Sequence, residues 1–154
     1  MNKPALIEKL NHAIALELCA VIQYNQYCNV LMGPDRRLWR DLFKDMSKGG
    51  LEHARKFGAR VVALGGTPTI EHTAVKQASQ INEMLHNALE LERALVTAYT
   101  EALEECSDHP AYRTLLEDII EHEQEEVDEL LIYLNKVEKA AAKKPDTARH
   151  SKTG

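Results

Sequence analysis

The chain has 154 residues, enough for one domain with a substantial hydrophobic core, and a net charge of −5. This charge gives no general reason to expect nucleic acid or an anionic membrane as a partner. No run approaches the roughly 18 apolar residues of a membrane span. Hydrophobic residues make up 44% of the sequence and aromatic residues only 5%, a composition that favours helices over a sheet.

The cysteines and the first residues of the chain bear on its cellular compartment. Three cysteines form no CxxC pair and leave an odd thiol. The opening MNKPALIEKLNHA lacks the apolar core of an export signal. We therefore expect a reduced, cytoplasmic protein.

Four helices are predicted, near residues 4–31, 36–64, 78–105 and 110–139, separated by the turn signals MGPD, GGTPT and CSDHP. The first and last links are short, which makes the helices they join antiparallel neighbours. The middle link is long enough to run the length of a bundle. We predict an all-α fold, an antiparallel four-helix bundle with a long crossover between helices two and three, over residues 1–140. The polar segment 141–154 is expected to be a disordered tail.

Each predicted helix carries an apolar series with a spacing of three to four residues, interrupted near its middle by an ionisable residue. The interrupting residues are Glu17 in the first helix, His53 in the second, Glu92 in the third, and Glu123 and Glu126 in the fourth. Antiparallel packing would bring all of them to one depth. Unpaired carboxylates in a core are costly, and no Lys or Arg lies at this level. One or two divalent cations would neutralise them, and this oxygen-rich donor set suits iron or manganese.

Each of these residues also has an ordinary structural interpretation. Glu123 and Glu126 lie in the acidic stretch EHEQEEVDEL and could belong to a solvated face. His53 alone could be a core histidine with a satisfied hydrogen bond. Tyr24 and Tyr99 are interpreted as core residues whose hydroxyls reach the polar centre. The other histidines, including His122, show no pattern and are predicted to be surface residues.

Several segments resemble bacterioferritin. ELCAVIQYNQY is similar to the first-helix motif of that family, and HARKFGARVVALGGTP to the end of its second helix. LELERALVTAYTEAL and LLEDIIEHEQEEVDEL resemble the third and fourth helices, so that the resemblance spans roughly residues 5–137. It implies a ferritin-like bundle with a di-iron centre that oxidises ferrous iron with O₂ or peroxide. It also implies self-association into a homo-oligomer, a dimer or larger.

The resemblance carries ligand roles to Glu17, His53, Glu92 and Glu123, but the sequence departs from the family at other positions. Gly50 stands where a bridging glutamate is expected, and Glu126 where a histidine is expected. Leu51 replaces the haem-binding methionine, so haem is not expected. The tail also lacks an amphipathic counterpart of the fifth helix of the family. We expect a modified centre with an open position beside Gly50.

The sequence is compatible with three functions. The first is a ferritin-like protein that binds iron and oxidises Fe(II) at a modified dinuclear site. The second is a di-metal oxidase that acts on a small organic substrate in a pocket beside Gly50. The third is a degenerate, non-catalytic bundle that serves as an assembly or binding module.

Overall fold

The computed structural model describes residues 1–143, and over this range it contains four helices and no strand. The helices are α1 (Lys3–Val30), α2 (Arg36–Ala63), α3 (Ile81–Glu104) and α4 (Pro110–Ala142). The predicted all-α class is confirmed. The third helix begins three residues later than expected, and α4 extends to Ala142, into the segment expected to be a tail. Residues 144–154 of that segment lie outside the described residues.

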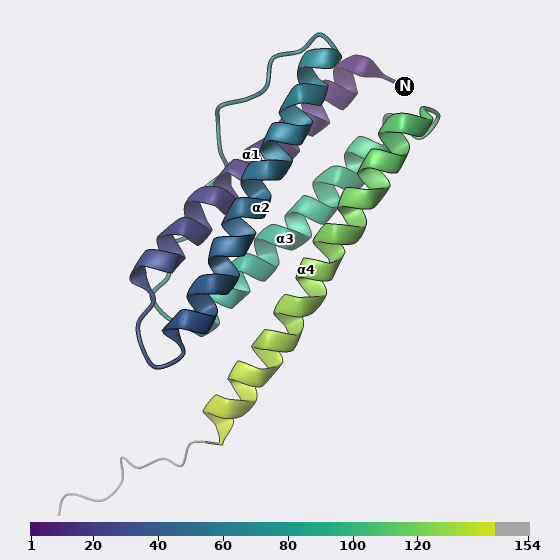
Figure 1. Ribbon diagram of the computed structural model, residues 1–154. Coiled ribbons are helices and arrows are strands. Elements are labelled where there is room, and N and C mark those ends of the chain that lie inside the picture. The colour runs from purple at the N-terminus through teal and green to yellow at the C-terminus, as the bar shows by residue number, and fades with distance from the viewer. Residues whose placement is uncertain (144–154) are drawn as a thin grey trace, which may run out of the picture.

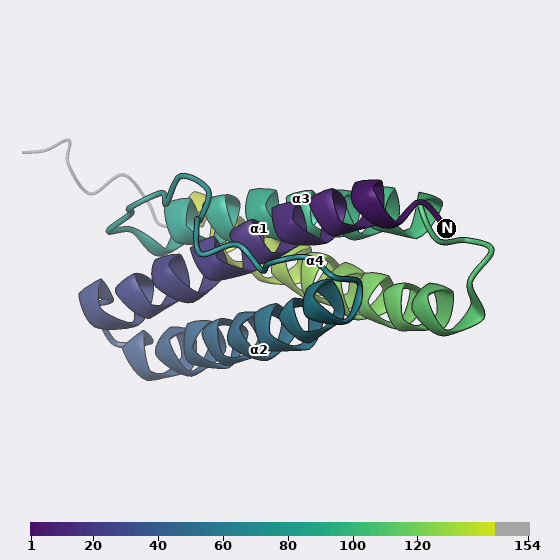
Figure 2. The same cartoon turned by 90° about the horizontal axis from the view of Figure 1, so that it is seen from above.

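The four helices form one elongated bundle (Figure 1). Helix α1 packs most extensively on α2, and α3 on α4, while α1 also packs on α3. The backbone N–H of Asn2 donates to the carbonyl of Glu105, which places the start of α1 beside the end of α3. These two helices are therefore antiparallel, and α2 and α3 run in the same direction because a long link returns the chain between them (Figures 1 and 2). None of the four helices is both long enough and apolar enough to cross a membrane.

The end of α2 directs the chain into this link. Gly65 adopts a positive φ of 90°, and its N–H donates to the carbonyl of Val62. The N–H of Gly66 donates to the carbonyl of Val61. This pair of bonds is the Schellman motif, which needs a left-handed residue after the helix and so favours glycine. The two glycines of GGTPT thus end the helix and start the crossover.

The crossover, residues 64–80, lies along α1. Near its beginning, the Asn11 side chain donates to the carbonyl of Thr67 and accepts from the N–H of Thr69. Further along, the N–H of Thr73 donates to the carbonyl of Ala15 at 3.2 Å. The link therefore follows the helix axis and satisfies its own backbone groups with side chains and carbonyls of α1, as a loop without secondary structure must.

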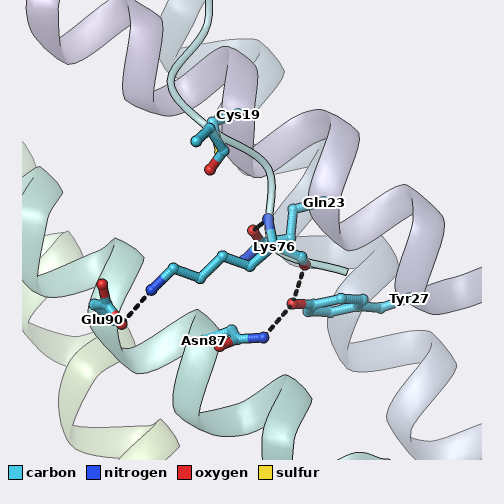
Figure 3. A network of polar contacts seen from close by, with 7 residues as sticks. Cys19, Gln23, Tyr27, Lys76, Asn87 and Glu90 are labelled. Atoms are coloured by element: carbon cyan, nitrogen blue, oxygen red, sulfur yellow. Dashed lines mark hydrogen bonds and ion pairs between the residues drawn. The ribbon is translucent and has the colours of Figure 1, made fainter. Parts of the chain in front are cut away.

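The far end of the crossover is fixed by a polar network between α1 and α3 (Figure 3). The N–H of Lys76 donates to Gln23 Oε1 at 2.8 Å, and the Tyr27 hydroxyl donates to the carbonyl of Lys76 at 2.7 Å. Asn87 donates in turn to the Tyr27 hydroxyl, and the Lys76 ammonium pairs with Glu90 at 2.6 Å. The hydrogen bonds of Gln23, Tyr27 and Asn87 hold the crossover between α1 and α3, whereas the exposed Lys76–Glu90 pair contributes little to its stability.

The core is built from the apolar series of the four helices. Its largest fully buried side chains include Tyr24, Tyr27 and Phe43, whose rings contact one another near the end of α1 and the start of α2. Phe57 packs on Tyr99 with ring centroids 4.7 Å apart. Cys19, Cys28 and Cys106 are free and buried among these side chains. Aromatic packing on both sides of the bundle centre leaves the polar residues enclosed between apolar layers.

Two adjacent glycines in α2 have different surroundings. A Cβ atom at Gly50 would lie 3.2 Å from Glu17 Oε2 and 3.3 Å from the Glu17 carbonyl oxygen, whereas one at Gly49 would meet nothing within 4 Å. Gly50 therefore permits a close approach of α1 to α2. Gly49 has no such packing role, and it lowers the intrinsic helix propensity of the segment.

This difference predicts opposite responses to alanine. Gly49→Ala should raise the free energy of unfolding of the metal-free protein by about 0.5–1 kcal/mol, because alanine is the better helix former. Gly50→Ala should be neutral or destabilising, because the new methyl group presses on the Glu17 carboxylate and backbone. Urea unfolding of the two variants measures the difference. Equal stabilisation by both substitutions would contradict a packing role for Gly50.

Candidate metal centre

Three carboxylates are buried at the centre of the bundle. Glu17 of α1, Glu92 of α3 and Glu123 of α4 are only 1%, 4% and 2% exposed. Each occupies a position in the apolar series of its helix, and for that reason its side chain points inward. His53 of α2 joins them with 16% of its side chain exposed. Glu126, one turn after Glu123 on α4, is half-buried. We call Glu17, His53, Glu92, Glu123 and Glu126 the central cluster.

His53 lies between two of the carboxylates. Its Nδ1 is 3.1 Å from Glu17 Oε1 and 2.9 Å from Glu123 Oε1. One ring N–H cannot point along both directions, and Glu123 Oε1 has no hydrogen-bond partner among the described residues. A buried carboxylate oxygen without a donor is unfavourable, and it marks a position at which a further positive group would be stabilised.

Two tyrosines donate hydrogen bonds to Glu17 and Glu92. The Tyr99 hydroxyl donates to Glu17 Oε1 at 2.6 Å, and the Tyr24 hydroxyl makes a short hydrogen bond to Glu92 Oε1. Burial raises the pKa of both phenols well above their ordinary value, so both remain protonated donors. The expectation that Tyr24 and Tyr99 reach the polar centre from the core is confirmed. Each fixes the orientation of one carboxylate.

The pKa shifts in the central cluster show that ionised carboxylates are unfavourable there without a cation. Burial raises the pKa of Glu17 to about 7, against the opposing effect of its hydrogen bond with His53. Burial also raises the pKa of Glu92 well above its usual range, and the neighbouring Glu123 raises it further. Burial by itself would lower the pKa of His53, but Glu123 and Glu17 outweigh it and raise that pKa to about 10. Near neutral pH the cluster therefore retains protons that a bound cation would displace.

The central cluster encloses a cavity of about 20 Å³, lined by Glu17, Ala20, Met46, Gly49, Gly50, His53, Glu92, His122, Glu123 and Glu126. This volume suffices for a water molecule or a metal ion. All five residues of the central cluster line it, and none of the lining residues is Lys or Arg. The structure thus places the five residues singled out in the sequence around one space, while their role as metal ligands stays a prediction.

Gly50 lines the central cavity, and it shares the space beside it with a side chain of α1. The Glu17 side chain lies directly against Gly50, because the missing Cβ lets its carboxylate approach the α2 backbone. Ala20 occupies the other side at 3.5 Å from the position of a Cβ. The space that a carboxylate at position 50 would need is thus partly filled from α1.

His122 is the residue that sequence reasoning missed. It is exposed, as expected, but its ring packs edge-on against His53 with centroids 5.2 Å apart. One ligand atom from each of His53, His122 and Glu123 lies within 4.8 Å of the others. The helical spacing of His122 and Glu126, four residues apart on one face, was the available signal. It was overlooked because His122 lies outside the apolar series of the fourth helix.

Comparison with known proteins agrees with this architecture. The family model of the ferritin-like domain matches residues 7–140. A bacterioferritin from Desulfovibrio desulfuricans is 32% identical over 130 residues, which cover 80% of this chain and 70% of that protein.

Two solved structures extend the likeness. A ferritin-like, diiron-carboxylate protein from Bacillus anthracis superposes with a TM-score of 0.84 and 30% identity, covering 87% of this chain and 98% of that one. The crystal structure of the D. desulfuricans bacterioferritin, described with its diiron site, has a TM-score of 0.78 and 26% identity and covers 99% of this chain and 95% of that one. Since the family match extends over most of the bundle and the bacterioferritin exceeds 30% identity, the chain belongs to the ferritin-like domain family.

Proposed function

We propose that the protein binds iron at the central cluster and oxidises Fe(II), with O₂ or peroxide as the electron acceptor. The observation that supports this most directly is the joint burial of Glu17, Glu92 and Glu123 around a cavity without a Lys or Arg. A protein core accepts such a concentration of carboxylates only when protons or cations neutralise it. The diiron site described for the D. desulfuricans bacterioferritin, to which this chain is similar, agrees with this proposal.

The donor set fits iron. Carboxylate oxygens with one or two imidazoles form a hard site that suits iron or manganese better than copper or a structural zinc. Glu17, His53, Glu92, Glu123 and Glu126 would hold one or two ions, and the unpartnered Glu123 Oε1 is a ready ligand atom. Binding would displace the protons of Glu92 and His53. Tyr24 and Tyr99 would keep the carboxylates in place as those protons leave.

The proposed oxidation of Fe(II) agrees with the negative charge of the cluster and with the size of its cavity. Each Fe(II) gives up one electron, so that reduction of O₂ to peroxide takes two electrons from two Fe(II) ions and two protons from solvent. Carboxylates interact more strongly with Fe(III) than with Fe(II), and the cluster therefore favours the oxidised ion. The cavity of about 20 Å³ at the central cluster holds a water-sized molecule beside the ions.

Replacing Glu123 tests the proposal. Fe(II) added anaerobically and then exposed to O₂ should be oxidised by the natural protein at least tenfold faster than by Glu123→Gln, because the variant loses the carboxylate that lies next to His53. Stopped-flow absorbance and an oxygen electrode measure the rate. The matched control is Glu90→Gln, an exposed glutamate on α3 that lies outside the cavity and should react like the natural protein. Equal oxidation rates in all three proteins would contradict a role for the cluster.

The non-catalytic binding module is the alternative that one observation favours. Gly50 removes a ligand from α2, and Glu17 occupies part of the space left behind. A protein that retains metal at the cluster but consumes no O₂ would support this alternative. Anaerobic metal analysis beside the oxidation assay separates the two functions.

We further infer that the protein forms a homo-oligomer, a dimer or larger, in a reducing, cytoplasmic compartment. Leu51 and Val62 are exposed about three turns apart on one side of α2, and a second copy packed on this helix would cover both apolar side chains. The three buried free cysteines agree with a reducing compartment. A monomeric mass by light scattering at micromolar concentration would contradict self-association.

A further inference from the structure

The cavity of the central cluster continues outward into a larger space between α2 and α4. This α2–α4 groove has a volume of about 450 Å³ and is lined on α2 by Leu38, Asp41, Leu42, Asp45, Met46 and Gly49, and on α4 by His122, Glu126, Glu129 and Tyr133. Four residues line both the groove and the inner cavity: Met46, Gly49, His122 and Glu126. They stand where the two spaces meet, and His122 and Glu126 are the ionisable ones.

Nothing in the rest of the described chain accounts for the position of His122. Its ring makes no hydrogen bond or ion pair within residues 1–143, and its notable neighbour is the ring of His53. The two rings cross at 87°, so that they meet edge to face without stacking. Two imidazoles and a carboxylate that converge within 4.8 Å of one another are spaced as ligands around a common ion.

Glu123 supplies an independent indication. Its carboxylate is 2% exposed, and Oε1 has no hydrogen-bond partner in the described chain although it lies 2.9 Å from His53 Nδ1. A buried carboxylate oxygen has more than one lone pair, and Oε1 shares the single Nδ1 of His53 with Glu17, so that it can accept a further positive ligand. The same oxygen belongs to the residue that converges with His53 and His122.

The glycines of α2 explain why a ligand would come from α4. Gly50 provides no donor, and the Glu17 carboxylate lies against it. Gly49 leaves the space beside it empty, since a Cβ there would meet nothing within 4 Å. Gly49 thus leaves α2 without a side chain at the junction of groove and cavity, which His122 also lines.

We infer that His122 is a metal ligand and that, with His53 and Glu123, it forms an outer cation position where the α2–α4 groove meets the central cavity. The inference rests on the proposed metal binding at the central cluster and adds a residue and a location to it. The outer position takes divalent cations that accept imidazole nitrogen, such as Fe(II), Co(II) and Zn(II). The acidic groove outside it, with Asp45, Glu126 and Glu129, attracts such cations toward the junction.

Zn(II) is the probe for the position itself, because it is diamagnetic and does not change redox state. Histidine-selective ¹⁵N NMR of the full chain during a Zn(II) titration should show the resonances of His53 and His122 shifting together. Those of His86, which pairs with Glu138 on the bundle surface, should stay unchanged. His53→Ala, His122→Ala and His86→Ala assign the three signals, and the last two also serve as variant and matched control.

Affinity gives the second readout. His122→Ala should weaken Co(II) binding at the outer position by about tenfold or more in calorimetry, and His86→Ala should leave it within twofold of the natural protein. His122 is exposed, so its replacement is expected to leave folding intact, and circular dichroism checks this. A Co(II) affinity unchanged by His122→Ala would overturn the inference.

The outcomes separate this inference from the proposed function. If Zn(II) moves the resonance of His53 but not that of His122, the inference is wrong while metal binding at the cluster stands. If both resonances move and Fe(II) is nevertheless not oxidised, the inference stands and the proposed oxidation is wrong. If neither histidine responds to Zn(II) or Co(II), both are wrong.

Discussion

Metal-free protein should unfold about 10 °C below the same protein saturated with Co(II) at pH 7.5. A ligand that binds only the folded state at 100 to 1,000 times its dissociation constant stabilises by about 3–4 kcal/mol. For a domain of this size each kcal/mol shifts the unfolding midpoint by about 2–4 °C. The stabilisation arises because the cation displaces the protons that the cluster retains and pairs with the unpartnered Glu123 oxygen. Calorimetry of chelator-treated protein, with and without added Co(II), measures the shift.

Two controls make this result specific. Mg(II) gives up its water shell reluctantly and should stabilise far less at the same concentration, because the cavity has too little room for a hydrated ion. Glu123→Gln should reduce the shift caused by Co(II), while Glu90→Gln should retain it. A shift below about 2 °C in the natural protein would show that the central cluster does not bind divalent metal in the folded state.

Glu92→Gln is expected to stabilise the metal-free protein at pH 8 by about 1–3 kcal/mol while weakening metal binding by about a hundredfold. Glu92 is buried next to Glu123, and its ionised form is strongly disfavoured in the fold. The amide has nearly the same shape, retains an oxygen that can accept from Tyr24, and carries no charge. Glu92 would thus lower the stability of the metal-free protein while it contributes to metal binding.

The sign of the pH dependence follows from the pKa shifts. Burial raises the pKa of Glu17 from the ordinary glutamate value of 4.5 to about 7, and that of Glu92 still higher. The unfolded chain therefore releases protons above pH 4.5 that the folded chain retains, and stability falls as the pH rises from there through 7. His53, whose pKa rises from 6.5 to about 10, stabilises fully below pH 6.5 and loses this effect as the pH approaches 10. All three groups make metal-free protein less stable at alkaline pH.

Urea unfolding between pH 5.5 and 8.5 checks this directly. The natural protein without metal should lose stability across this range, and Glu92→Gln should lose less, because one of the groups responsible is gone. Glu90→Gln, which changes an exposed residue of the same helix, should follow the natural protein. If Glu92→Gln were less stable than the natural protein at pH 8, the favourable contacts of Glu92 in the fold would outweigh the cost of burying its carboxylate.

Much of the fold was predictable because the sequence is locally consistent. Breaks at MGPD, GGTPT and CSDHP separate four apolar periodicities, and the family resemblance specified how such helices assemble. The structure confirms the helices within a few residues at their ends. The start of the third helix was predicted too early because residues 78–80 are compatible with a helix. In the structure, the crossover instead has no regular structure through residue 78 and bends at residues 79–80, after its anchor at Lys76.

The sequence by itself determined the four helices, their order and the ionisable residue at the middle of each apolar series. Only the tertiary structure decided that His53 lies within 3.1 Å of two carboxylates, that Glu17 takes the space beside Gly50, and that His122 joins the cluster from outside its apolar series. The reason is that the periodicity of the sequence determines only on which side of its own helix a residue lies. The rotation and offset of one helix against another arise from the packing of side chains from all of them.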